Sequence, residues 1–167
     1  MKKICFFSGD ITRSGGTERV GTVIANELHK RGQFEISIVS LWEDKKKTFF
    51  HLEQGIKRDT LFSDHVSGKK ILTYVKAVKK YVENNKIDVL VDIDGILDLY
   101  SIPALKKTKC KLVSWEQFNY YVNPYVSYRK LTRKMAAKKA DAIVVLTDED
   151  KHFYEKETDV KTKLVRI

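Results

Sequence analysis

The sequence predicts an α/β protein with a Rossmann-like, doubly wound, mostly parallel sheet that carries helices on both faces. Short apolar runs of strand length alternate with longer stretches of helical period along the chain. Some of these runs are apolar at nearly every position, as in IDVLVDI at 87–93, which is typical of strands buried on both sides in a parallel sheet. No internal repeat and no linker rich in proline or glycine interrupts the alternation, so we expect a single domain over residues 1–167.

The first half of the chain opens with a strand, KICFFS at 3–8. A helix is predicted over 17–31, because apolar side chains recur there at helical spacing (Val20, Val23, Ile24 and Leu28) and Arg31-Gly32 supplies a basic end followed by a stop. The remaining elements of this half are a strand at 35–41, weaker strand candidates at 49–52 and 56–62, a helix at 69–85 and the strand at 87–93.

The second half continues the same alternation. It contains a short helix at 99–107, the strand CKLVSW at 110–115, a helix at 125–139 and the strand ADAIVVL at 140–146. Thr147 and the three acidic residues after it are typical of an N-cap with an acidic first turn. They predict a last helix that runs to about Lys156, before the strand-like tail KLVRI.

The composition excludes several classes of protein. With 43% hydrophobic and 32% charged residues the chain is typical of globular proteins, and no apolar run approaches the roughly 20 residues that a membrane-spanning helix needs. Cys5, Cys110 and the four scattered histidines show no metal-site spacing, so we expect free thiols in a reducing cytoplasm and no metal or cofactor. The net charge of +10 favours a polyanionic partner, or marks only a lysine-rich surface.

Ligands of such sheets bind at the carboxyl ends of the strands, and the loop SGDITRSGGTER follows the first strand there. Gly15, Gly16 and Thr17 stand where the helix begins, and free N–H groups at a helix start suit a phosphate that glycines allow to approach closely. The loop matches neither GxGxxG nor GxxxxGK[ST], so a dinucleotide fingerprint and a P-loop are excluded. The alternative is a plain glycine turn, and Glu18 in the first turn would repel a close anion.

Two further loops at this edge carry polar groups. Asp92, Asp94 and Asp98 suggest a metal at first sight, but their spacing matches no calcium loop, so loop and cap roles are favoured. The segment SWEQFNYYVNPY mixes hydrogen-bonding side chains with aromatic ones, as many small-molecule sites do, although some of these aromatics would be core residues instead. The groups for hydrogen bonding are Glu116, Gln117 and Asn119, and the aromatics are Trp115, Phe118, Tyr120, Tyr121 and Tyr125.

The helix at 125–139 carries six lysines and arginines and no acid. A basic amphipathic helix is typical of a segment that lies on an anionic membrane surface, which would involve Arg129, Lys130, Arg133 and Lys134. The alternative is a solvated helix face without a partner.

Taken in order, MKKICFFSGDITRSGGTERVGTVIANELHKRG, IDVLVDI and ADAIVVLTDED resemble the N-terminal domain of GT-B glycosyltransferases of family 4. The resemblance covers nearly the whole chain. It implies one of two Rossmann-like domains with a cleft between them, and transfer of a sugar from a nucleotide donor with retention of configuration, usually without a metal. It further implies that Gly15 and Gly16 approach the donor's phosphates.

The chain departs from that family in two respects. The family continues into a C-terminal nucleotide-sugar-binding domain with an E-x7-E segment, which these 167 residues lack, so we expect them to be the N-terminal, acceptor-side domain and inactive without the other. The family often has Glu-His after the strand that corresponds to 110–115, whereas this chain has Glu116-Gln117. Glutamine does not transfer protons as histidine does, so no catalytic residue is assigned.

The sequence thus predicts the acceptor-side domain of a retaining glycosyltransferase that acts on a glycan or lipid-linked acceptor in bacterial surface polysaccharide synthesis. Gly15, Gly16 and Thr17 would contact the donor's phosphates, and Asp94 would join Glu116, Gln117 and Asn119 at the acceptor. We expect a cytoplasmic protein, peripheral at the inner face of the membrane, that binds no nucleic acid. The alternative is a stand-alone α/β module that binds a phosphorylated metabolite or nucleic acid.

Overall fold

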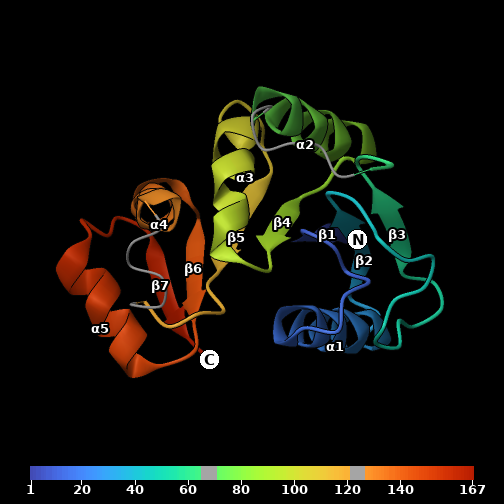
Figure 1. Ribbon diagram of the computed structural model, residues 1–167, viewed down its shortest axis with the longest axis horizontal. Coiled ribbons are helices and arrows are strands. Elements are labelled where there is room, and N and C mark those ends of the chain that lie inside the picture. The colour runs from blue at the N-terminus through green and yellow to red at the C-terminus, as the bar shows by residue number, and fades with distance from the viewer. Residues whose placement is uncertain (65–70, 121–126) are drawn as a thin grey trace.

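The computed structural model describes residues 1–64, 71–120 and 127–167, and it contains a seven-stranded sheet. The strand order is β3-β2-β1-β4-β5-β6-β7, and every pairing is parallel (Figure 1). The strands are β1 (Lys2–Ser8), β2 (Phe34–Ser40), β3 (Lys57–Thr60), β4 (Val89–Asp92), β5 (Lys111–Trp115), β6 (Ala142–Val145) and β7 (Lys163–Arg166). The predicted Rossmann-like class is confirmed.

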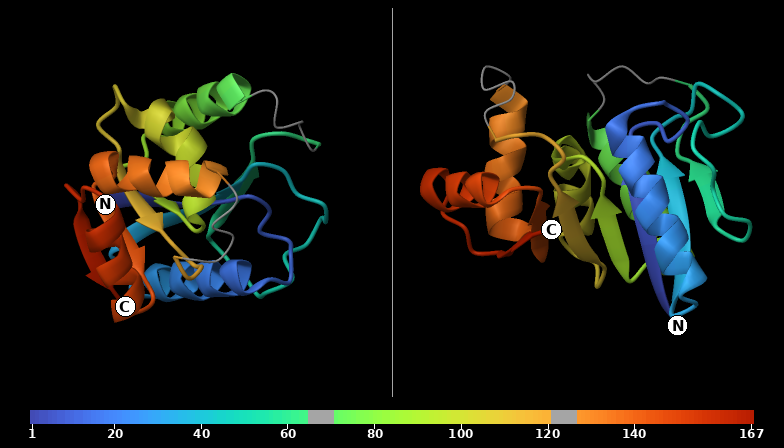
Figure 2. Two further views of the ribbon diagram at one scale, coloured as in Figure 1. Left: turned by 60° about the vertical axis from the view of Figure 1, so that its left-hand side comes forward. Right: turned by 90° about the horizontal axis from the view of Figure 1, so that it is seen from below.

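Helices cover both faces of the sheet, and they are unevenly divided (Figures 1 and 2). They are α1 (Gly16–Lys30), α2 (Ile71–Asn85), the 3-10 turn η2 (Gly95–Leu97), α3 (Asp98–Leu105), α4 (Ser127–Lys139) and α5 (Asp148–Glu157). One hydrophobic core joins the sheet to α2, α3, α4 and α5, and a second core on the opposite face joins it to α1. The chain order therefore winds in both directions from β1, as a doubly wound sheet requires.

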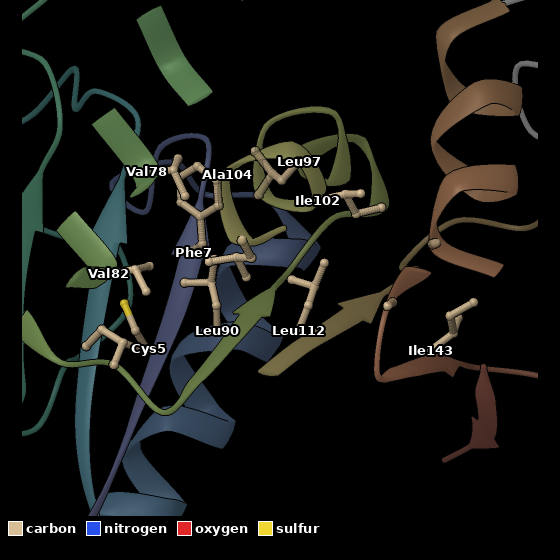
Figure 3. Packing of buried hydrophobic residues seen from close by; sticks show 14 of the residues in the cluster. Cys5, Phe7, Val78, Val82, Leu90, Leu97, Ile102, Ala104, Leu112 and Ile143 are labelled. Carbon is tan, nitrogen blue, oxygen red and sulfur yellow. The ribbon is translucent and has the colours of Figure 1, made fainter. Parts of the chain in front are cut away.

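The larger core lies under α2 and α3 (Figure 3). Phe7 and Leu90 from the middle strands meet Val78 of α2 and Ala104 of α3 there. Cys5 is fully buried in this core, and burial raises the pKa of its thiol to about 12, so the side chain acts as a small apolar residue.

Helix α1 forms where its apolar spacing predicts, but its most apolar stripe does not face the sheet. Val20, Val23 and Ile24 are 36–50% exposed, whereas the buried positions are occupied by small residues such as Gly21 and Ala25 and by polar residues such as Thr22. A Cβ at Gly21 would lie 3.0 Å from Ile93 Cδ1, so the helix sits too close to the sheet for larger residues on that face.

Most element boundaries agree with the sequence within one to three residues. Residues 49–52 are the exception, since they form a bend and loop rather than a strand. The predicted starts of two helices, at 69 and at 125, lie outside the described residues.

Candidate functional site

A hollow of about 500 Å³ lies at the carboxyl ends of β1 and β4. Three segments far apart in the sequence supply its walls: the loop between β1 and α1, the turn after β4, and the region of β5 and α4. The polar, charged and aromatic side chains that line it are Ser8, Asp10, Arg13, Thr17, Glu18, Asp94, Phe118 and Arg129. We call this hollow the edge cavity. It lies at the carboxyl ends of the strands, where ligands of doubly wound parallel sheets bind.

The first wall is the glycine loop, residues 9–15. Its base is fixed by Asp10, whose carboxylate accepts hydrogen bonds from the Thr12 N–H at 2.8 Å, the Thr12 hydroxyl at 2.6 Å and the Asp44 N–H at 3.2 Å. Its tip, from Arg13 to Gly16, is exposed. Sequence reasoning missed Asp10 and Arg13 as cavity residues, since nothing in their spacing marks them.

The two glycines of the predicted phosphate site differ in what surrounds them. Gly16 begins α1, and a Cβ added there would meet no atom within 4 Å, so the helix start is open. Gly15 is the N-cap residue, and a Cβ there would collide with the carboxylate of Glu18. Gly15, Gly16 and Thr17 all line the edge cavity, so the structure brings the predicted trio to a ligand-sized hollow.

The second wall is a charged pair. The guanidinium of Arg129 in α4 donates to both carboxylate oxygens of Asp94, with Nη1–Oδ1 at 3.1 Å and Nη2–Oδ2 at 3.3 Å. The guanidinium also lies 4.6 Å from the ring centroid of Phe118. Asp94 in addition caps η2 by accepting from the Ile96 N–H at 3.1 Å. Asp94 thus lines the edge cavity, and its charge is already compensated by Arg129.

A second arginine of α4 fixes the β5 loop, residues 116–120. Arg133 Nε donates to Glu116 Oε2 at 2.8 Å, and the same guanidinium donates to the backbone carbonyls of Asn119 and Tyr120. Glu116 also accepts from the Phe118 N–H at 3.2 Å. Burial raises the pKa of Glu116, which is only 2% exposed, while Arg133 opposes the rise. Glu116 therefore holds the loop together and lies off the cavity wall.

The other residues of the predicted acceptor set also lie outside the wall of the edge cavity. Gln117 is half-buried, and its Nε2 has no hydrogen-bond partner among the described residues. Asn119 is exposed. Of the predicted aromatics, Phe118 lines the cavity, Trp115 is buried in the second core, and Tyr120 packs against Tyr154 at 5.2 Å between ring centroids. Tyr121 and Tyr125 lie outside the described residues.

The structure corrects the predicted membrane surface of α4. Arg133 is 4% exposed and belongs to the buried ion pair with Glu116, so its assignment to a membrane surface is wrong. The side chain of Arg129 is 13% exposed and turns toward Asp94. Lys130 and Lys134 are exposed. The helix therefore has both buried and exposed cations. Its own sequence does not show which are buried, because the acidic partners Asp94 and Glu116 come from the loops after β4 and β5.

Beneath the edge cavity lies a pair of fully buried aspartates. Ser101 donates to Asp92 Oδ1 at 2.9 Å and Ser114 donates to Asp98 Oδ2 at 2.6 Å. Burial raises the pKa of Asp92 to about 7 and raises that of Asp98 well above its usual value. The described residues contain no group of three or more histidine, cysteine or acidic side chains that could hold a metal ion.

A second hollow of about 560 Å³ lies at the opposite edge, between the ends of α3 and α4. Four lysines, among them Lys106 and Lys139, surround a floor that includes Leu105 and Met135. Both helices end there, and lysines at helix C-termini compensate the negative end of the helix dipole. Lysines at these helix ends therefore have a structural role that needs no ligand.

The known proteins that this chain resembles include the following three. An uncharacterized glycosyltransferase of Haemophilus influenzae is 31% identical over 156 residues, which are 93% of this chain and 43% of that protein. The structure of sucrose-phosphate synthase from Thermosynechococcus elongatus superposes with a TM-score of 0.78 at 10% identity, over 100% of this chain and 48% of that one. HepE of Anabaena, in complex with UDP-glucose, superposes with a TM-score of 0.63 at 12% identity, over 100% and 43%. No protein-family model matches the chain.

The chain thus spans less than half the length of each of these proteins. At such low identity the structural likeness shows the fold, while the sequence likeness extends to a protein named as a glycosyltransferase. The chain is therefore a glycosyltransferase-like domain with a Rossmann-like parallel sheet, which these larger proteins contain as one part.

Proposed function

We propose that these 167 residues are the N-terminal, acceptor-side domain of a retaining glycosyltransferase of family 4. The enzyme transfers a sugar from a nucleotide-sugar to a glycan or lipid-linked acceptor, in the synthesis of bacterial surface polysaccharide. The similarity to a named glycosyltransferase over 93% of the chain supports the class of reaction. The match to only 43% of that protein supports a further nucleotide-sugar-binding domain in the whole enzyme.

The observation that carries the proposal is the open start of α1 at Gly16, inside a hollow that also holds Asp94, Arg129 and Phe118. Free N–H groups and the partial positive charge of a helix start stabilise a diphosphate, whose negative charge grows as the sugar leaves it. Carboxylate, guanidinium and aromatic groups in the same hollow suit a sugar's hydroxyls and its apolar face.

The β5 loop would present the acceptor. Gln117 offers an amide without a partner among the described residues, and Asn119 is exposed beside it. Glu116 and Arg133 act as positioning residues, because they hold this loop without facing the edge cavity. No described residue is assigned proton transfer.

Sugar transfer by the intact protein, with labelled UDP-sugars and other nucleotide-sugars, tests the proposal. Gly16→Val places a branched side chain into open space in the cavity, so we expect donor affinity to fall about tenfold or more while the melting temperature stays unchanged. Ser14→Val is the matched control, since Ser14 is exposed in the same loop and does not line the cavity.

Three results of these assays would contradict the proposal in different ways. Unchanged donor affinity in Gly16→Val would make the glycines a plain turn. Transfer by residues 1–167 without further polypeptide would contradict the two-domain arrangement. Binding of nucleotide-sugars or phosphorylated metabolites by the intact protein without any transfer would favour the stand-alone binding module. Arg13 would suit such a module too, because its guanidinium is exposed, lines the cavity and has no partner among the described residues.

We also propose a peripheral position at the inner face of the membrane, carried by Lys130 and Lys134 rather than by the arginines of α4. Both lysines are exposed, and exposed lysines attract anionic lipid headgroups. No helix among the described residues is long and apolar enough to span a bilayer.

A further inference from the structure

Three carboxylates line the edge cavity, and two of them are fully engaged. Asp10 accepts three hydrogen bonds from Thr12 and Asp44, and Asp94 is paired with Arg129 and caps η2. Glu18 differs, since its side chain forms no hydrogen bond and no ion pair with any described residue, although it is only 9% exposed. A carboxylate that lines a cavity and has no partner among the described residues keeps its hydrogen-bonding capacity for a ligand.

Glu18 does not complete a capping box at the start of α1, which is the usual structural role of a glutamate at this helix position. Glu18 is the third helical residue of α1, where a glutamate can reach back to the N–H of the N-cap residue and complete a capping box. The N-cap residue Gly15 has no side-chain capping hydrogen bond, and the carboxylate of Glu18 lies over its Cα instead of at its N–H. The partial positive charge of the helix start favours an acidic side chain in this first turn.

We propose that Glu18 is a ligand-binding residue that accepts hydrogen bonds from two neighbouring hydroxyl groups of a sugar in the edge cavity. This inference rests on the proposed function in taking the ligand to be a sugar. An ionised carboxylate only accepts hydrogen bonds, so hydroxyls satisfy it, whereas a phosphate beside it would be repelled. The start of α1 would therefore have two binding positions: sugar hydroxyls would bind beside Gly15, near the Glu18 carboxylate, and phosphate would bind on the open side at Gly16.

The division explains the glycine pair in physical terms. A Cβ at Gly15 would collide with the Glu18 carboxylate, so this flexible side chain would have to leave its present position at the cavity. A Cβ at Gly16 would meet no atom within 4 Å, so the absence of a side chain there leaves room for a ligand and is not required by protein packing.

Glu18→Gln tests the inference, because it keeps the shape of the side chain and removes its charge. The backbone amide signals of residues 15–19 in NMR spectra of the 167-residue chain would report binding of glucose, galactose, N-acetylglucosamine, UDP-glucose and inorganic pyrophosphate. Glu27→Gln is the matched control, an identical change on the same helix at an exposed residue that does not line the cavity.

We expect at least one of the sugars to shift these signals in a saturable manner, and Glu18→Gln to weaken that binding about tenfold, as expected for the loss of a hydrogen bond to a charged group. Binding of pyrophosphate should stay the same or become tighter, since a negative charge is removed. Glu18→Asp keeps the charge but shortens the reach, so it should weaken sugar binding in the same way if the carboxylate contacts hydroxyls directly.

Two results would overturn the inference. If Glu18→Gln tightens the binding of UDP-glucose and pyrophosphate equally, Glu18 only repels anions from the helix start. If no sugar perturbs residues 15–19, the carboxylate has no hydroxyl ligand. Both results concern binding alone, so they are distinguishable from a failure of the proposed function, which is measured as absent sugar transfer.

Discussion

The glycine loop and the β5 loop lie at the same edge of the sheet, but they are built in opposite ways. The base of the glycine loop is fixed by Asp10 and by hydrogen bonds from the Ile11 N–H to Ser40 Oγ and from the Trp42 N–H to the Gly9 carbonyl. Arg13 at its tip and Glu18 in the first turn of α1 have no side-chain partner among the described residues. The β5 loop is closed on itself, because Arg133 binds the Glu116 carboxylate and two backbone carbonyls of the same five residues.

This difference distinguishes side chains that are available to bind a ligand from side chains that hold the protein structure in place. A side chain whose hydrogen-bonding capacity is used up inside the protein stabilises the fold and has little left to offer a ligand. By this criterion Glu116 and Arg133 are supports, and Glu18, Arg13 and the helix start at Gly16 are the ligand-facing groups. Residue type and position at the sheet edge do not reveal the distinction.

The largest effect is expected from opening the closed loop. Arg133→Leu removes the nearer cation of the buried Glu116 carboxylate and leaves only Arg129, whose Nη1 lies 3.9 Å from Glu116 Oε1. The free energy of unfolding should therefore fall by about 3–5 kcal/mol. Urea denaturation measures this. Lys134→Leu at the next position is the control, and because Lys134 is exposed its change should stay within about 0.5 kcal/mol.

A second substitution separates the ion pair from the rest of the loop. In Glu116→Leu/Arg133→Leu no buried charge remains, so the double variant should lose less stability than the sum of the two single ones. If Arg133→Leu were as stable as the wild type, the β5 loop would not depend on the pair, and the contrast between the two loops would be lost.

An intermediate effect is expected from the aspartates under the edge cavity. The folded-state pKa of Asp92, about 7, lies above its usual value of 3.8, and that of Asp98 is also raised. Between about pH 4 and pH 7 the folded protein therefore binds more protons than the unfolded chain. The free energy of unfolding should then fall as pH rises through this range, by at most about 1.4 kcal/mol per pH unit for each extra proton.

Asp98→Asn tests this assignment, because asparagine has a similar shape and does not titrate. Urea denaturation at a series of pH values should show a smaller loss of stability between pH 4 and pH 7 in the variant than in the wild type. An equal loss in both proteins would assign the pH dependence to other groups.

The smallest effect on stability is expected from the lysines of α4. Lys130→Glu/Lys134→Glu should leave the unfolding free energy nearly unchanged, and it should weaken binding to vesicles that contain phosphatidylserine by about 1 kcal/mol for each lysine removed. Co-sedimentation with such vesicles measures this, with neutral phosphatidylcholine vesicles as the control. Unchanged co-sedimentation would indicate that these lysines only form a solvated helix face and do not bind a membrane.

Local patterns in the sequence were sufficient to place nearly every element. The parallel sheet follows from runs such as IDVLVDI, since strands covered on both faces carry apolar residues at consecutive positions. The start of α5 followed from its cap, and Thr147 indeed accepts from the Asp150 N–H at 3.0 Å. The sheet rule also located the cavity, because the carboxyl ends of β1 and β4 meet at one edge.

The sequence by itself determined the fold class, the order of the elements and the edge at which the glycine pair stands, because these depend on local periodicity and on rules for parallel sheets. Only the tertiary structure decided which charges are free. Arg133 is one of six cations on a helix without acids, and its buried role is set by Glu116, which lies 17 residues away in the chain. Likewise Glu18 became a candidate ligand residue only when its lack of a partner could be seen, since the pairing of charges depends on distances in space.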